Sequence, residues 1–194
     1  MPILVVATSN PGKVQEMQAY LTDPAFSGWI LKLKPAELEI EETGTTFLEN
    51  ACLKASQIAK ALGEWAIADD SGLSVDALNG APGLYSARYA ETDQARIERL
   101  LRELETAANR QAHFTCAIAV ARPDGSIALQ TEGICAGEIL SSARGNGGFG
   151  YDPVFYMPEH QMTFAEMPPD LKHAVSHRGQ AFAALLPALK QLQL

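Results

Sequence analysis

The chain has 194 residues, of which 47% are hydrophobic and 20% are charged. That length fits one domain, large enough to bury a core without disulfide bonds. The net charge of −8 argues against nonspecific binding to nucleic acid, which needs many phosphate-neutralising lysines and arginines. Small anionic ligands, nucleotides included, stay open because a local basic pocket or a metal can override the net charge.

Other features of the composition bear on the compartment. No apolar run reaches the length of a membrane span, and the first seven residues lack the basic region of a signal peptide. The three cysteines, Cys52, Cys116 and Cys135, are widely spaced. We expect reduced, buried thiols in a cytoplasmic protein, not a disulfide frame or a zinc site.

The first predicted elements are a strand over Ile3–Ala7, a polar turn over Thr8–Lys13, and a helix with apolar residues at helical spacing. Asn10 suits the position that caps this helix, and Pro11 suits its first turn. Backbone donors and Lys13 therefore gather at a helix N-terminus, which favours anions. A well-capped helix without any ligand explains the same pattern equally well.

A second strand is expected within Trp29–Ile40, although Pro35 interrupts it, and a helix over Phe47–Leu62. Thr46 and Glu49 have the spacing of a capping box. Asn50 and Lys54 are four residues apart, so they share another face of that helix.

The most informative feature is the pair Asp69-Asp70, where a short apolar strand is expected to end. Strand alternation implies that at most one of the two points toward the core. A carboxylate there is costly unless it is paired or bound to a cation, and open α/β sheets place ligands at strand ends. Glu41 and Asp70 could converge to hold Mg²⁺ against substrate phosphates. The alternatives are a solvated Glu41-Glu42 loop and an aspartate that caps a Ser71-Gly72 bend.

The later elements complete a single α/β domain with a mixed sheet. They are a loop over Asn79–Gly83, a helix around Asp93–Leu104, an antiparallel hairpin of His113–Ala121 and Ser126–Thr131, a glycine-rich stretch over Gly145–Pro153, a short apolar run over Val154–Tyr156, and a final helix from about His177.

The second half of the chain contains two further sets of candidate ligand-binding residues. In the glycine-rich stretch, glycines allow close backbone approach, and Phe149 and Tyr151 offer stacking faces, unless both aromatic rings enter the core. Lys172, His177 and Arg178 bring three donors near the start of the last helix. Arginine has a planar fork suited to a keto oxygen or phosphate, although exposed polar residues at a helix start are also common.

Six segments, in order along nearly the whole chain, resemble the non-canonical purine nucleoside triphosphate pyrophosphatases, the inosine/xanthosine triphosphate pyrophosphatase family. They are Thr8-Ser-Asn-Pro-Gly-Lys13, Glu41-Glu-Thr-Gly-Thr-Thr-Phe-Leu-Glu-Asn-Ala51, Ala68-Asp-Asp-Ser-Gly72, Pro82-Gly-Leu-Tyr-Ser-Ala-Arg-Tyr89, Gly148-Phe-Gly-Tyr-Asp-Pro153 and Ser176-His-Arg-Gly-Gln-Ala181. Any one segment is weak evidence, but six in sequence are highly specific.

The resemblance implies an elongated two-lobed α/β fold over residues 1–194, with a mixed, twisted sheet, flanking helices and a substrate cleft between the lobes. It also implies a homodimer, a requirement for Mg²⁺, and hydrolysis of ITP, dITP and XTP to the monophosphate and pyrophosphate. The link from Tyr89 to the helix near Asp93 is shorter than in many relatives, which leaves the local rim of the cleft or the dimer edge open.

The same resemblance assigns roles to residues. Asp70 becomes the proton acceptor and, with Glu41, a metal ligand. The residues expected to contact substrate are Thr8, Ser9, Asn10, Pro11, Gly12 and Lys13 at the triphosphate, Ser71, then Phe149, Gly150, Tyr151 and Asp152 at the base and ribose, and Lys172, His177 and Arg178 at base and phosphate.

The implied chemistry is attack of water on the α-phosphorus, with Mg²⁺ and Lys13 neutralising the charge that develops. Arg178 or His177 would donate to the 6-keto oxygen of the purine, whereas the 6-amino group of adenine would leave buried donors unpaired. Rejection of guanine is not explained. Two other readings stay open: a pyrophosphatase of the Maf group, acting on other modified or on canonical nucleotides, and a nucleotide-sensing module without turnover. Intact Glu41, Asp70 and Lys13 argue against the sensor.

Overall fold

The computed structural model describes residues 1–192, so the last two residues of the predicted 1–194 domain lie outside the described part. The chain divides into two compact units. The first unit consists of Met1–Asp70, Cys116–Gly133 and the segment from His177 onward, and the second of Ser71–Thr115 and Ile134–Ser176. Each unit has its own hydrophobic core.

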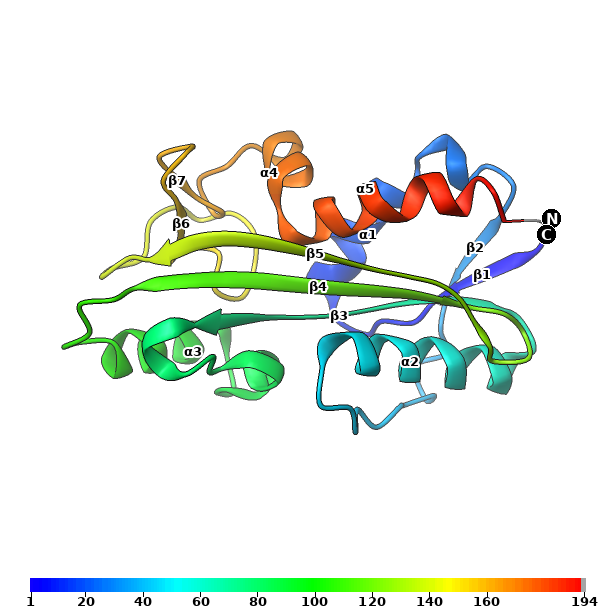
Figure 1. Cartoon of the computed structure of the whole chain (residues 1–194), viewed down its shortest axis with the longest axis horizontal. Helices are drawn as coiled ribbons and strands as arrows, with labels where there is room; N and C mark the ends of the chain where they lie inside the picture. The colour runs from blue at the N-terminus through cyan, green and yellow to red at the C-terminus, as the bar shows by residue number, and fades with distance from the viewer. Residues whose placement is uncertain (193–194) are drawn as a thin grey trace. The chain divides into compact units, whose positions relative to one another are not determined.

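Within residues 1–192, seven strands form one sheet in the order β2-β1-β3-β4-β5-β6-β7 (Figure 1). Their bounds are β1 Ile3–Val6, β2 Ile30–Leu33, β3 Trp65–Val75, β4 Gln111–Ala121, β5 Ile127–Ile139, β6 Phe155–Met157 and β7 Met162–Thr163. Strand β1 pairs in parallel with β2 and β3, whereas β6 pairs antiparallel with β5 and β7. The predicted mixed sheet of an α/β protein is confirmed.

In the first unit, helices cover both faces of the sheet (Figure 1). Helices α1 (Pro11–Leu21) and α5 (His177–Leu189) pack on one face with Ile67, and α2 (Phe47–Leu62) packs on the other with Ala66 and Ala68. Neighbouring residues of β3 point to opposite faces. Its apolar residues in this unit therefore divide between two hydrophobic clusters, one on each face of the sheet. Both faces are therefore buried, which accounts for the continuous apolar run before Asp69.

The connections in this unit reverse the order of strands at β1. The chain leaves β1 through α1 to reach β2 on one side, then returns through α2 to β3 on the other side. Such a reversal of strand order is a topological switch point, where ligands of open α/β sheets bind beyond the carboxyl ends of the strands. The pairing of β1 with β3 reaches the pair Val6↔Ile67, and Asp69-Asp70 follow one residue later in β3.

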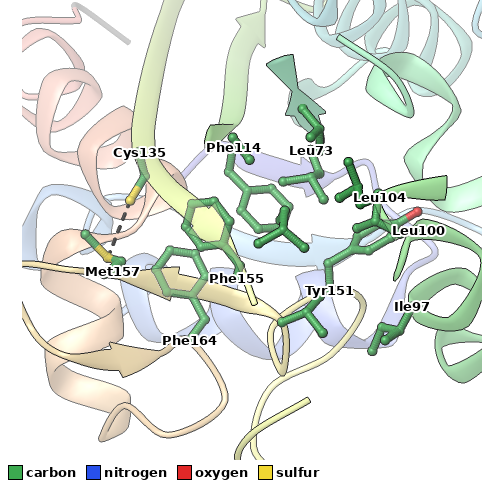
Figure 2. Close-up of a cluster of buried hydrophobic side chains, with 14 of the residues drawn as sticks. Leu73, Ile97, Leu100, Leu104, Phe114, Cys135, Tyr151, Phe155, Met157 and Phe164 are labelled. Atoms are coloured by element: carbon green, nitrogen blue, oxygen red, sulfur yellow. Dashed lines mark hydrogen bonds between the residues drawn. The ribbon is translucent and has the colours of Figure 1, made fainter. Parts of the chain in front are cut away.

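The second unit contains α3 (Asp93–Glu103), α4 (Pro169–Val175), and the 3₁₀ turns η2 (Asp76–Leu78) and η3 (Gly83–Arg88), while a further turn, η1 (Pro24–Phe26), lies in the first unit. Phe114, Phe155 and Phe164 meet in the core of the second unit at centroid distances of 4.7 to 5.8 Å (Figure 2). The thiol of Cys135 lies 3.6 Å from the sulfur of Met157 in the same cluster.

Several predicted boundaries are wrong. Strand β3 continues to Val75 instead of ending at Asp70, because Leu73 and Val75 have a core of their own in the second unit and burial there outweighs the turn signal of Ser71-Gly72. Strand β2, by contrast, lies within the predicted segment Trp29–Ile40 and stops before Pro35, the residue expected to interrupt it. The second hairpin strand runs on from Thr131 to Ile139, while β7 and α4 were not predicted.

Two compositional expectations are tested within residues 1–192. All three cysteines are free of disulfide bonds there; Cys116 and Cys135 are buried as expected, but Cys52 is only half-buried. None of the helices in the described part has both the length and the apolarity to cross a membrane.

Candidate active site

The turn after β1 is built around the cap of α1. The Asn10 Oδ1 accepts hydrogen bonds from the backbone N–H groups of Gly12 (2.9 Å) and Lys13 (3.2 Å), and Thr8 Oγ1 accepts one from Asn10 N–H (3.3 Å). Pro11 occupies the start of the helix, so the predicted cap is confirmed. The positive end of α1 and the Lys13 side chain both lie at the topological switch point after β1. Thr8, Ser9 and Pro11 also line an open pocket of about 430 Å³ beside α1 and the end of β2.

Asp69 faces α1 and α5, where it is fully buried. Its Oδ2 lies 3.1 Å from Lys13 Nζ and accepts a 2.9 Å hydrogen bond from Arg178 Nη2. Burial alone would raise the pKa of Asp69, but Lys13 and Arg178 outweigh it and hold the pKa well below its ordinary value. Asp69 is therefore an ionised carboxylate within a buried ion network.

Arg178 is the centre of that network. Its side chain is 1% exposed, and its second nitrogen, Nη1, donates to Glu16 of α1. Asp69 and the other carboxylate raise the pKa of Arg178 above its ordinary value despite burial. In this structure the guanidinium fork is directed at two carboxylates of its own unit. His177, next to it in α5, is also buried.

Asp70 faces the opposite side, toward α2. Asn50 Nδ2 donates to its Oδ2 (3.1 Å), and Lys54 Nζ lies 3.5 Å from its Oδ1 and 2.8 Å from Glu42 Oε1. Burial is the largest cause that raises the pKa of Asp70; Lys54 and Lys13 lower it in part, and Glu42 raises it. The pKa of Lys54 is raised because Asp70 and Asp69 outweigh its own burial.

The expectation that at most one of these aspartates points into the core is wrong. Asp69 is 0% and Asp70 is 7% exposed, because helices cover both faces of β3. The suggested turn at Ser71-Gly72 does not exist either, since the strand continues. Strand alternation does place the two side chains on opposite faces of β3. Asp69 pairs there with Lys13 and Arg178, and Asp70 with Lys54.

The donor atoms on the α2 side fit a hard divalent cation. Mg²⁺ is usually held by one or two carboxylates together with water and substrate phosphates, not by an all-protein cage. Asp70 and Glu42 both contact the ammonium group of Lys54, so their oxygens already surround a positive charge. Glu41 is exposed in the same loop, next in the chain to Glu42. Within residues 1–192, no group of three or more His, Cys, Asp or Glu side chains is arranged around a common metal position.

In the second unit, the glycine-rich stretch packs around the side chain of Asp152. The buried Asp152 Oδ2 accepts from Phe149 N–H (2.9 Å) and from Lys172 Nζ (2.5 Å). The same ammonium lies 5.3 Å from the centre of the Phe149 ring, within cation–π range. Gly148, at φ +71°, is packed so closely that a Cβ would come 1.9 Å from Asp152 Oδ2.

The two aromatic rings of this stretch behave differently. Tyr151 is buried in the hydrophobic cluster of the second unit (Figure 2), and its hydroxyl donates to Ser86 O (2.9 Å). For this residue the core alternative is therefore the correct one. Phe149 is only half-buried. The backbone N–H of Gly150 donates to Asp93 Oδ2 (2.7 Å).

The predicted site residues thus fall into two groups. Thr8 to Lys13, Asp70, His177 and Arg178 lie in the first unit with Glu41, whereas Ser71, Phe149 to Asp152 and Lys172 lie in the second. Lys172 belongs to α4 and not to the last helix.

Sequence reasoning assigned no site role to Glu16 or Asn50. A signal was present for Asn50, since asparagine is a poor helix former in a helix interior and this one lies four residues before Lys54.

These features define a class of protein: an α/β protein with a switch-point site of buried carboxylates, lysines and a capped helix N-terminus, suited to a phosphorylated ligand. A sequence model of the Ham1 family matches residues 4–188, and the chain belongs to that family.

Similar proteins cover nearly the whole chain. Proteins named dITP/XTP pyrophosphatase from a Nostoc species and a Synechocystis species are 68% and 63% identical, covering 96% and 98% of this chain and 94% and 98% of their own lengths. The solved structure of a HAM1 protein from Coxiella burnetii has a TM-score of 0.89 and 43% identity, covering 99% of this chain and all of that one. The predicted family resemblance is confirmed.

Proposed function

We propose that this protein is a Mg²⁺-dependent nucleoside-triphosphate pyrophosphatase that converts ITP, dITP and XTP to the monophosphate and pyrophosphate. The observation that carries the proposal is Asp70, a buried carboxylate held by Asn50 and Lys54 at the switch point, with Lys13 on the other side of the same strand. Relatives that share the whole chain are named for dITP and XTP.

The triphosphate site we propose is the turn after β1. Thr8, Ser9, Asn10, Pro11, Gly12 and Lys13 would contact the phosphates. The positive end of the α1 dipole and the Lys13 ammonium supply positive charge, while Asn10 caps the N–H groups of Gly12 and Lys13. Lys13 is held by Asp69, so its position is set before substrate arrives.

Asp70 is the proposed general base, because its carboxylate can accept a proton from water once its orientation is set. Asp70 and Glu41 would hold Mg²⁺, with Glu42 on the same loop. When bound, the ion would neutralise phosphate charge and lower the pKa of water.

Recognition of the base and ribose is proposed for Phe149, Gly150, Tyr151 and Asp152, with Ser71 and Lys172. Half-buried Phe149 offers a stacking face, whereas Tyr151 acts through its backbone and its buried ring. His177 and Arg178 remain proposed donors to the purine 6-position; contact of Arg178 with a base requires it to leave Glu16 or Asp69.

A single two-lobed enzyme domain, a homodimer and a cytoplasmic location are proposed on the family resemblance. The free thiols of Cys52, Cys116 and Cys135 are consistent with a reducing compartment. Light scattering after gel filtration would test the dimer.

The decisive experiment incubates purified protein and Mg²⁺ with ITP, dITP, XTP, dTTP, GTP and ATP and identifies the products. We expect pyrophosphate and a monophosphate from ITP, dITP and XTP. Orthophosphate would contradict attack at the α-phosphorus. Preference for dTTP would favour an enzyme of the Maf type. Binding of nucleotides without turnover would favour a sensor.

The Asp70→Asn variant tests the general base. We expect turnover to fall by roughly 10² to 10⁴, the usual contribution of general acid–base catalysis, because an amide cannot accept the proton. The thermal midpoint should stay within a few degrees of the parent protein. Near-normal turnover would remove Asp70 from the reaction.

A further inference from the structure

Asn50 has two hydrogen-bond partners that connect separate parts of the site. It lies in the first turn of α2 and is 3% exposed. Its Nδ2 donates to Asp70 Oδ2 (3.1 Å), and its Oδ1 accepts from the backbone N–H of Gly44 (2.8 Å). One buried amide thus joins the carboxylate in β3 to the loop before α2.

That loop is tightly packed against the helix. A Cβ at Gly44 would come 2.7 Å from both Asn50 Oδ1 and Glu49 Cβ, so close contact with the helix requires glycine. The next residue, Thr45, donates through its N–H (2.6 Å) and its hydroxyl (2.8 Å) to Glu49 Oε2. Glu49 and Asn50, which are consecutive in α2, therefore both hold the loop that carries Glu41 and Glu42. Only Asn50 of this pair also binds Asp70.

The geometry at Asp70 needs such a donor. The terminal torsion of an aspartate is broad, so the orientation of its carboxylate depends on the hydrogen bonds that it accepts. Lys54 lies nearer Oδ1 and Asn50 binds Oδ2, and contacts at both oxygens restrict rotation. An amide supplies the second contact without adding a charge between Asp70 and Glu42.

We infer that Asn50 is a positioning residue that sets the orientation of the Asp70 carboxylate and ties the Glu41–Glu42 loop to it. The inference rests on the proposed pyrophosphatase function. Asn50 is buried and its amide is engaged by Asp70 and Gly44, so its removal should affect kcat and leave substrate affinity nearly unchanged.

Two substitutions separate the two contacts. Asn50→Asp keeps an acceptor for Gly44 N–H but replaces the donor facing Asp70 with a carboxylate oxygen, whereas Asn50→Ala removes both contacts without adding charge. We expect kcat for ITP to fall about 100-fold in each, the cost of a catalytic group misplaced by about 1 Å. KM, and the Kd of a non-hydrolysable triphosphate analogue, should change less than about 3-fold. Amide hydrogen exchange at Gly44 should accelerate in Asn50→Ala alone.

Thr163→Val is the matched control. It removes a hydrogen bond from a fully buried side chain, Thr163 Oγ1 to Arg144 O (2.8 Å), in β7, and should leave kcat within about 2-fold. A parent protein without turnover would contradict the proposed function. An active parent whose Asn50 variants lose no more kcat than Thr163→Val, or lose affinity in the same proportion as kcat, would overturn the positioning role.

Discussion

Asp69 and Asp70 are neighbours in the chain, but they ionise in different surroundings. Asp69 pairs with Lys13 and Arg178, while Asp70 accepts from Asn50 and lies near Lys54. Taking a carboxylate out of water costs several kcal/mol unless its partners are complete. The two residues therefore serve different purposes: Asp69 holds cations in place, and Asp70 is held.

This contrast predicts the effect of removing Arg178 on stability. Arg178→Met keeps the apolar stem but leaves Asp69 with an incomplete set of partners. We expect the free energy of unfolding to fall by about 3 kcal/mol, the low end for breaking a buried pair, because Lys13 still contacts Asp69. Urea denaturation measures the loss.

Arg144→Met provides the comparison, since Arg144 and Glu166 form a pair with side chains 45% and 28% exposed. Its loss should be about 1 kcal/mol or less. Equal losses in the two variants would show that the Arg178 network contributes no more than a surface ion pair.

At the scale of elements, the glycine-rich stretch depends on close packing against one carboxylate. Gly148 and Gly150 both have positive φ, +71° and +62°, but they differ in the space around them. A Cβ at Gly148 would overlap Asp152 Oδ2, whereas nothing lies within 4 Å of a Cβ at Gly150. The two positions separate backbone strain from steric overlap.

Alanine at each position tests this distinction. Gly150→Ala should cost about 1 kcal/mol, the penalty of a left-handed conformation for a residue with a Cβ. Gly148→Ala should cost at least about 1 kcal/mol more, because Asp152 must move away from Lys172 and Phe149 N–H. That difference corresponds to roughly 2 to 4 °C in the thermal midpoint, measurable by calorimetry. Identical midpoints would mean that Asp152 shifts without cost.

The elements predicted best were those with local signals. Asn10 and Pro11 define the start of α1, and Thr46 with the apolar spacing after it defines α2, whose predicted bounds match the observed ones. Strand β3 was cut short because Asp-Ser-Gly is a turn signal that burial of Leu73 and Val75 overrides. The two-residue β7 is too short for any periodicity.

At the scale of the whole molecule, the mixed sheet and the family followed from the order of strands, helices and motifs. The ion pairs within the site did not follow from this order. Arg178 contacts residues 109 and 162 positions away in the chain. No local pattern indicates that its guanidinium group is directed at Asp69 and Glu16. The burial of both aspartates likewise depends on helices from distant segments.

The back-to-back aspartates have a consequence for engineering. Their hydrogen bonds lead to different helices, α1 and α5 for Asp69 and α2 for Asp70, so side-chain shapes on either face can be varied in separate libraries. Their charges are shared, however, since Lys13 also lowers the pKa of Asp70 and Lys54 that of Asp69. Mutant collections that vary shape but conserve charge on each face should therefore retain far more active members than collections that randomise both.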